Sequence, residues 1–94
     1  MYKIFFHEKV KEDLKEIPQF HLLAVKKAID ERLGMRPFDF KALSGEKYKG
    51  LYRLRVSDFR IIYRIDENLR KVTVLAIGHR RLVYKDPDNV ALRG

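Results

Sequence analysis

The chain contains no cysteine, which excludes a disulfide framework and excludes thiolates as metal ligands or nucleophiles. It also lacks long apolar runs, and none approaches the roughly 20 residues that a transmembrane helix requires. The first residues, MYKIFFHEK, do not have the layout of a signal peptide. We therefore expect a soluble cytoplasmic protein without a membrane partner.

Internal repeats, low-complexity segments and linkers are absent as well. The 94 residues are therefore expected to form a single domain that spans residues 1–94. The hydrophobic content of 46% is typical of a globular protein and too high for a disordered one.

Acidic residues are scarce in one stretch of a basic chain, whose net charge is +8. Between residues 47 and 64 only Asp58 opposes the basic side chains, which are Lys47, Lys49, Arg53, Arg55, Arg60 and Arg64. In the N-terminal third, by contrast, lysine alternates with aspartate and glutamate at helical spacing. The uneven charge indicates an acidic partner, for which RNA, DNA, an anionic membrane and an acidic protein segment are all candidates.

Residues 50–65, GLYRLRVSDFRIIYRI, have the alternation of a β-hairpin. A two-residue loop at Ser57 and Asp58 would pair apolar or aromatic side chains across the two strands, namely Val56 with Phe59, Leu54 with Ile61 and Tyr52 with Tyr63. The same register places Arg55 opposite Arg60, and such a like-charge pair costs roughly 0.5 to 1 kcal/mol in a water-like medium. An anion that lies over both guanidinium groups would convert this repulsion into affinity.

The remaining patterns predict an α+β fold with the order β-α-α-β-β-β. A first strand is expected over residues 2–6, and two helices follow, the second over residues 20–33 with Gly34 at its C-terminal cap. Strand 72–78 is apolar on both faces, so we expect it at the centre of the sheet. The predicted architecture is a small antiparallel sheet with two N-terminal helices packed on one face. In the connector, Phe38, Phe40 and Leu43 are expected to pack beneath the helices.

A second cluster of candidate site residues follows the last strand and comprises His79, Arg80, Arg81 and Tyr84. Arginine binds phosphate through paired hydrogen bonds and can stabilise a pentacoordinate transition state. Tyr84 could stack on a base, and His79 could transfer a proton near neutral pH. No carboxylate cluster or His-x-x-x-His spacing indicates a metal or another cofactor. Cleavage would therefore be metal-free, with an RNA 2′-hydroxyl as the nucleophile.

Simpler explanations exist for several of these residues. Arg53 and Arg64, taken singly, could be solvated charges on the outer face of a sheet. His79 could be an exposed loop histidine, and Tyr84 could serve only in packing. His7 and His21 are expected to be structural or surface residues.

The stretches YRLRVSDFRIIYRI and VLAIGHRRLVY, in this order in a short basic chain, resemble the RelE/ParE superfamily of toxins from toxin–antitoxin modules. The resemblance covers nearly the whole chain and is nearer to the RelE-type mRNA interferases. It implies a type II toxin that cleaves mRNA in the ribosomal A site. It also implies a cognate RelB-like antitoxin, with which the toxin forms a hetero-oligomer.

The resemblance also implies residue roles. Arg53 and Arg60 would bind phosphate and stabilise the transition state, Arg80 would stabilise the leaving 5′-oxygen, and Tyr84 would stack on a base. Further RNA contacts are expected from Lys47, Lys49, Arg64 and Arg81. The best-known relatives have lysines where Arg53 and Arg55 stand, and the resemblance implies that one of those lysines is the base that takes the 2′-hydroxyl proton. Arg55 is a poor base because arginine stays protonated to about pH 12. Either His79 is the base, or cleavage depends on electrostatics and geometry supplied with the ribosome.

Two other functions are compatible with the same residues. A ParE-like toxin would inhibit DNA gyrase without nuclease chemistry. A non-catalytic module would bind RNA or the ribosome through the basic face alone.

Overall fold

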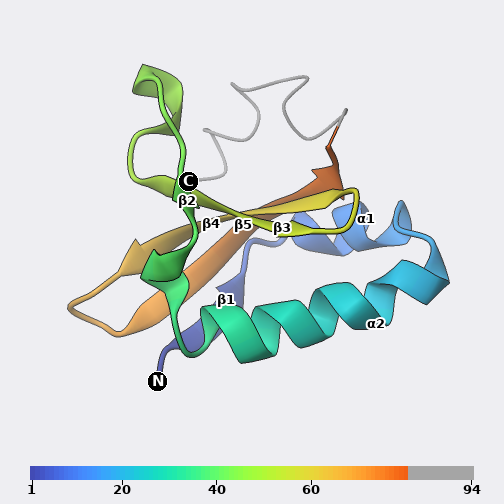
Figure 1. Cartoon of the computed structure of the whole chain (residues 1–94), viewed down its shortest axis with the longest axis horizontal. Coiled ribbons are helices and arrows are strands. Elements are labelled where there is room, and N and C mark those ends of the chain that lie inside the picture. Colours follow the sequence, from blue (N-terminus) through green and yellow to red (C-terminus); the bar gives the residue numbers. More distant parts are fainter. Residues whose placement is uncertain (81–94) are drawn as a thin grey trace.

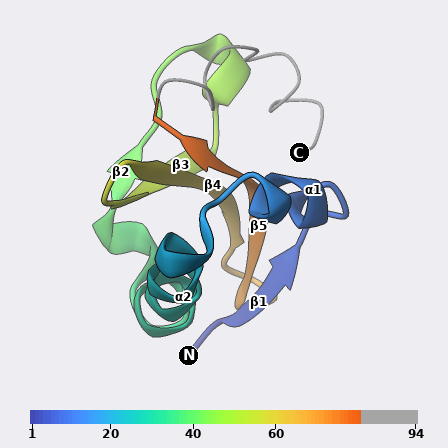
Figure 2. The ribbon, with the colours of Figure 1, turned by 90° about the vertical axis from the view of Figure 1, so that its right-hand side faces the viewer.

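The computed structural model describes residues 1–80, and these form a five-stranded sheet with the strand order β1-β5-β4-β3-β2. Both helices lie on one side of this sheet (Figures 1 and 2). Among these 80 residues, no helix is both long and apolar enough to cross a membrane. Arg81 and Tyr84 lie outside the described residues.

The elements follow one another in the predicted order, with two 3-10 turns and one short strand in addition. Their bounds are β1 Lys3–Phe6, α1 Val10–Lys15, α2 Gln19–Ala28, the π-helical turn η1 Ile29–Leu33, the 3-10 turn η2 Pro37–Asp39, β2 Lys41–Ala42, the 3-10 turn η3 Glu46–Tyr48, β3 Leu51–Val56, β4 Phe59–Asp66 and β5 Lys71–His79.

The sheet is mixed. Its β2-β3, β3-β4 and β4-β5 pairs are antiparallel, whereas β1 pairs parallel with β5. The α+β class and the two helices on one face are confirmed, and β5 is an interior strand as expected, although β4 is the middle one. The expectation of a purely antiparallel sheet is wrong for the β1-β5 pair. Parallel neighbours need a long crossover connection, and the chain between β1 and β5 contains both helices and the hairpin. β2 was missed because two residues are too short to show alternation.

The main core lies between the sheet and the helices. Phe59, Ile61 and Tyr63 of β4 point into it, as the hairpin pattern predicts, and the three predicted cross-strand pairs are present. The Tyr63 ring stacks on Tyr52 at 5.7 Å, and its hydroxyl donates a 2.6 Å hydrogen bond to the carbonyl oxygen of Pro37. Burial raises the pKa of the Tyr63 phenol well above its ordinary value.

The second predicted helix extends to Leu33 as α2 and η1, but Gly34 does not have the left-handed conformation of a glycine cap. Its φ and ψ are −66° and −27°, which any residue adopts. A Cβ atom at this position would lie only 2.6 Å from the carbonyl oxygen of Asp30. Glycine is required here for space rather than for backbone freedom.

A smaller apolar cluster covers part of the other face of the sheet. Leu51, Ile62, Leu75 and Ala76 form this cluster, and Leu43 and Tyr48 pack against it. Of the connector residues expected beneath the helices, Phe40 packs there, Leu43 lies on the opposite face and Phe38 is 49% exposed. The pairing of β2 with β3 brings the chain to the sheet edge, and the following loop folds onto the second face (Figure 2).

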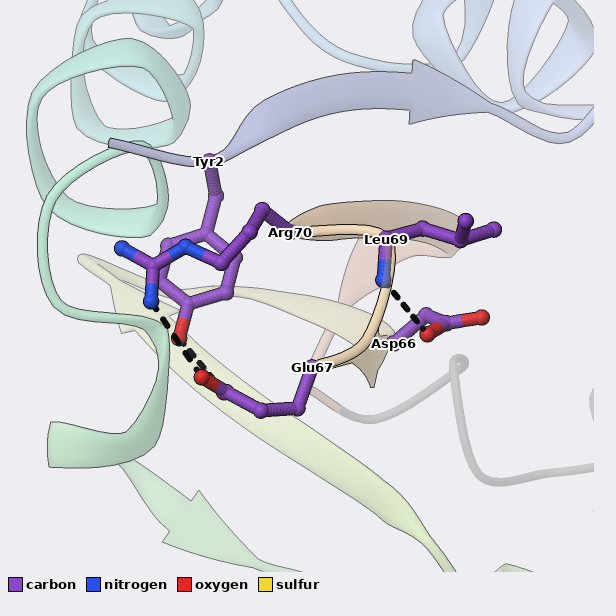
Figure 3. A network of polar contacts seen from close by, with 5 residues as sticks. All are labelled: Tyr2, Asp66, Glu67, Leu69 and Arg70. Carbon is purple, nitrogen blue, oxygen red and sulfur yellow. Dashed lines mark hydrogen bonds and ion pairs between the residues drawn. The ribbon is translucent and has the colours of Figure 1, made fainter.

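The turn between β4 and β5 holds the N-terminus in place. The Tyr2 hydroxyl donates a 2.6 Å hydrogen bond to the Glu67 carboxylate, which also pairs with Arg70 at 3.2 Å (Figure 3). The Arg70 guanidinium lies 4.4 Å from the centre of the Tyr2 ring. The hydrogen bond to Glu67 favours the neutral phenol and raises the pKa of Tyr2.

Candidate nucleic-acid interface

The hairpin places four arginines on the face of the sheet that is opposite to the helices. In the observed register Arg55 is paired with Arg60, Arg53 with Ile62 and Arg64 with Leu51. Side chains that are directly opposite across a ladder share a face, and the partners of Arg53 and Arg64 belong to the second apolar cluster. We call the surface formed by Arg53, Arg55, Arg60 and Arg64 the arginine face.

Arg60 is the most enclosed of these side chains, with 8% of its surface exposed, whereas Arg55 is exposed. The Arg60 Nη1 donates hydrogen bonds to the carbonyl oxygens of Phe59 at 3.2 Å and of Ser57 at 3.4 Å. A buried cation requires such partners, and here they hold the guanidinium close to the hairpin loop. On the neighbouring strand the residue opposite Arg60 is Gly78, which has no side chain to cover it.

Arg80 is brought to the same end of the hairpin by Asp58. The Arg80 amide donates to the Asp58 carbonyl oxygen at 2.7 Å, and the Arg80 Nε lies 4.0 Å from the Asp58 carboxylate. Asp58 follows Ser57, whose carbonyl oxygen accepts from Arg60. The structure thus brings together Arg55, Arg60 and Arg80, which the sequence separates by up to 25 positions.

His79 is not placed with these arginines. It is still part of β5, where it is paired with Phe59, and its ring meets the Phe59 ring edge-on at 5.9 Å. Phe59 belongs to the helix-side core and also contacts His21 of α2. Sequence reasoning treated His79 as the first residue beyond the strand, but the strand continues through it, and alternation directs its side chain to the helix-bearing face.

Lys47 and Lys49 lie on the loop that packs over the second apolar cluster. Between them, Tyr48 contacts that cluster, so this loop borders the arginine face at the end where Leu51 lies. Arg81 and Tyr84 lie outside residues 1–80, and their roles remain predictions.

Lys41 is a basic residue that sequence reasoning missed. It is exposed and stands opposite Arg53 across the β2-β3 ladder, on the arginine face. A two-residue strand has no periodic pattern, so only the pairing itself reveals this neighbour. Within residues 1–80, no three or more histidine, aspartate or glutamate side chains come together in an arrangement that could hold a metal.

Both sequence comparisons with known proteins match this chain to toxins. Residues 4–84 match the family model described as ParE toxin of the type II toxin–antitoxin system. A curated relative in Methanocaldococcus jannaschii, named RelE1 as a candidate toxin, is 32% identical over 91 residues, which cover 92% of this chain and 98% of the relative.

Solved structures with a similar fold include RelE proteins. The toxin–antitoxin complex RelBE2 of Mycobacterium tuberculosis contains a chain that is 30% identical, with a TM-score of 0.78 over 84% of this chain and 91% of that chain. A mutant of Escherichia coli RelE in the free state is 17% identical, with a TM-score of 0.74 over 98% and 95% of the two chains. This last similarity concerns the fold alone.

Proposed function

The chain belongs to the RelE/ParE superfamily of type II toxin–antitoxin toxins, and from this we propose that it is a ribosome-dependent endoribonuclease that cleaves mRNA. The observation that carries the proposal is the meeting of Arg55, Arg60 and Arg80 at one end of the arginine face. Three guanidinium groups gathered from three separate segments suit a phosphodiester whose negative charge increases in the transition state.

In the proposed reaction the RNA 2′-oxygen attacks the adjacent phosphorus while the bond from phosphorus to the 5′-oxygen breaks. The products are a 2′,3′-cyclic phosphate and a fragment with a 5′-hydroxyl. Arg55 and Arg60 bind the non-bridging oxygens of the reacting phosphate, Arg53 beside them binds the adjoining RNA backbone, and Arg80 stabilises the leaving oxygen. Tyr84 stacks on a base, and further RNA contacts come from Lys47, Lys49, Arg64 and Arg81.

The 2′-hydroxyl must also lose its proton, which passes to water, and the leaving 5′-oxygen takes up a proton from water to become the 5′-hydroxyl. The arginines are poor bases. His79 faces the helix layer, where the centre of its ring lies 5.9 Å from the centre of the Phe59 ring. This placement favours the second of the two earlier alternatives, in which cleavage depends on electrostatics and on geometry that the ribosome supplies. The arginines then stabilise the charge of the transition state and hold the RNA backbone in an attacking conformation.

We also propose a RelB-like antitoxin as partner in a hetero-oligomer, since the similar M. tuberculosis chain comes from a complex of this kind. An apolar cavity of about 400 Å³ is lined by residues of β1, α1, α2, η1 and β5, with Lys11, Lys26 and Asp30 among them. On α2, Phe20 and Leu23 are 79% and 75% exposed. An acidic antitoxin segment with apolar side chains would complement this surface and the +8 charge of the toxin.

The nuclease proposal can be tested with mRNA on programmed ribosomes. Arg80→Gln and Arg55→Gln remove exposed cations from the proposed site, and Arg32→Gln removes an exposed cation from η1 as a matched control. Losing one transition-state donor should lower the cleavage rate about 10²- to 10³-fold for Arg80→Gln, with little change in the control. Equal cleavage by parent and both site variants would show that the site is misplaced.

A gyrase inhibitor is the second candidate, because the matching family model is that of ParE toxins. A supercoiling assay separates the two functions. Arrest of DNA gyrase with mRNA left intact would favour the ParE-like function, whereas cut mRNA with normal supercoiling would favour the endoribonuclease.

A further inference from the structure

We propose that Lys41 is part of the RNA-binding surface and that, together with Arg53, it holds a phosphate next to the one held by Arg55 and Arg60. The inference rests on the proposed function, since it identifies a second phosphate position on the same face. It starts from the pairing of Lys41 with Arg53 across the β2-β3 ladder.

Two like-charge pairs stand side by side along β3. The outer pair is Lys41 with Arg53, and the tip pair is Arg55 with Arg60. Like charges directly opposite each other across a ladder destabilise the sheet, and here this occurs twice in succession on one face. A ligand with two negative charges at matching positions would remove both repulsions, which a single anion cannot do.

The spacing of the two pairs suits a nucleic-acid backbone. Arg53 and Arg55 are two residues apart on one strand, which places the pairs about 7 Å apart along β3. Neighbouring phosphates of an extended single strand can match this separation. The outer pair therefore extends the phosphate path from the hairpin end towards the β2 edge of the sheet.

Lys41 and Arg53 bind phosphate in different ways. Arg53 can form two parallel hydrogen bonds with one phosphate, whereas the ammonium of Lys41 acts as a compact charge on a flexible stem. Lys41 is exposed at the edge of the sheet, so it can reach a backbone that lies across β3. Its contribution should be mainly electrostatic and should therefore depend on salt.

Binding of a single-stranded 2′-O-methyl RNA oligonucleotide, which cannot be cleaved through the 2′-oxygen, tests the inference over a range of salt concentrations. Lys41→Gln should reduce the slope of log K against log salt by roughly 0.7 and weaken binding about fivefold near 0.1 M salt, as expected for one lost phosphate contact. Lys15→Gln, which removes an exposed lysine from α1 on the helix side, is the matched control and should leave the slope unchanged.

A double variant tests whether the two side chains share one phosphate. If they do, Lys41→Gln combined with Arg53→Gln should weaken binding less than the product of the two single effects. If the parent binds the oligonucleotide and Lys41→Gln behaves like Lys15→Gln, the role of Lys41 is overturned while the proposed function stands. If the parent itself does not bind the oligonucleotide, even at low salt, the second phosphate position is overturned, while the cleavage assay on programmed ribosomes decides the proposed function separately. Thermal unfolding should show that Lys41→Gln is at least as stable as the parent, because the substitution removes one like-charge pair from the sheet.

Discussion

Arg80 is joined to Asp58 twice, by a 2.7 Å hydrogen bond from its amide to the Asp58 carbonyl oxygen and by a 4.0 Å ion pair between its Nε and the Asp58 carboxylate. Asp58 is also the only acidic residue between positions 47 and 64. A negative charge in a basic region would weaken the binding of RNA. A role for Asp58 in directing the Arg80 guanidinium towards the other arginines would explain why an acidic residue stands in this region.

Asp58→Asn should therefore separate binding from turnover. The substitution removes a negative charge, so RNA should bind more tightly. It also releases the Arg80 side chain, and turnover on programmed ribosomes should fall by about two- to fivefold, which corresponds to the modest free energy of an exposed ion pair. Measurement of KM and kcat for both proteins provides the test.

Asp39→Asn is a matched control for this variant, because Asp39 forms a comparable exposed ion pair with Arg36 at 3.6 Å, and its charge acts on Tyr63 of the helix-side core. We expect it to change neither constant. A rise in affinity without a fall in kcat would show that Asp58 acts only through its charge and does not position Arg80.

The tip pair, Arg55 with Arg60, should destabilise the folded toxin when RNA is absent. Arg55→Gln removes the repulsion from Arg60, so it should raise the free energy of unfolding by about 0.5 to 1 kcal/mol while it weakens binding of the 2′-O-methyl oligonucleotide. Urea denaturation and RNA titration on the same preparation measure the two effects. Arg32→Gln, on the helix side, should alter neither. An Arg55→Gln protein that is less stable than the parent would mean that the two guanidinium groups do not repel each other in the free toxin.

The sequence predicts the hairpin well because its apolar alternation and the two-residue loop at Ser57 and Asp58 together fix the register. A one-residue slip would turn Phe59, Ile61 and Tyr63 away from the helices, so the pairing of Arg55 with Arg60 could be foreseen. β2 and the position of Lys41 could not be foreseen. They arise from a two-residue pairing that depends on the tertiary structure and leaves no pattern in the chain.

The direction of the His79 side chain could not be predicted from the sequence, for a different reason. Whether its side chain joins the arginines or the helix layer depends on where β5 ends and on the register shift near Tyr63. The register that pairs Gly78 with Arg60 leaves His79 opposite Phe59. One residue more or less in β5 would exchange the two faces, and residues 72–78, which are largely apolar on both faces, do not encode this choice.

The buried hydroxyl of Tyr63 should contribute to stability. It donates to the Pro37 carbonyl oxygen at 2.6 Å, and Tyr63→Phe would leave that buried acceptor without its donor. We expect a loss of about 1 to 2 kcal/mol in the free energy of unfolding, measured by urea denaturation at neutral pH. Tyr52→Phe keeps the same ring stack and changes a half-buried side chain, so it should cost less. Equal losses in the free energy of unfolding for the two variants would show that the hydrogen bond to Pro37 adds no stability beyond that of the Tyr52 hydroxyl.

The same phenol should make the fold sensitive to alkali. Its pKa is raised chiefly by burial, with smaller contributions from Tyr52 and Asp39, so the native state holds this proton more tightly than the unfolded chain does. The associated stability is complete below the unfolded pKa of about 10 and is lost progressively as the pH rises above it. Urea denaturation of the parent between about pH 8 and pH 11 should show this decline, and Tyr63→Phe, which has no proton to lose at that position, should decline less steeply. Parallel curves for the two proteins would mean that Tyr63 ionises as easily in the native state as in the unfolded chain.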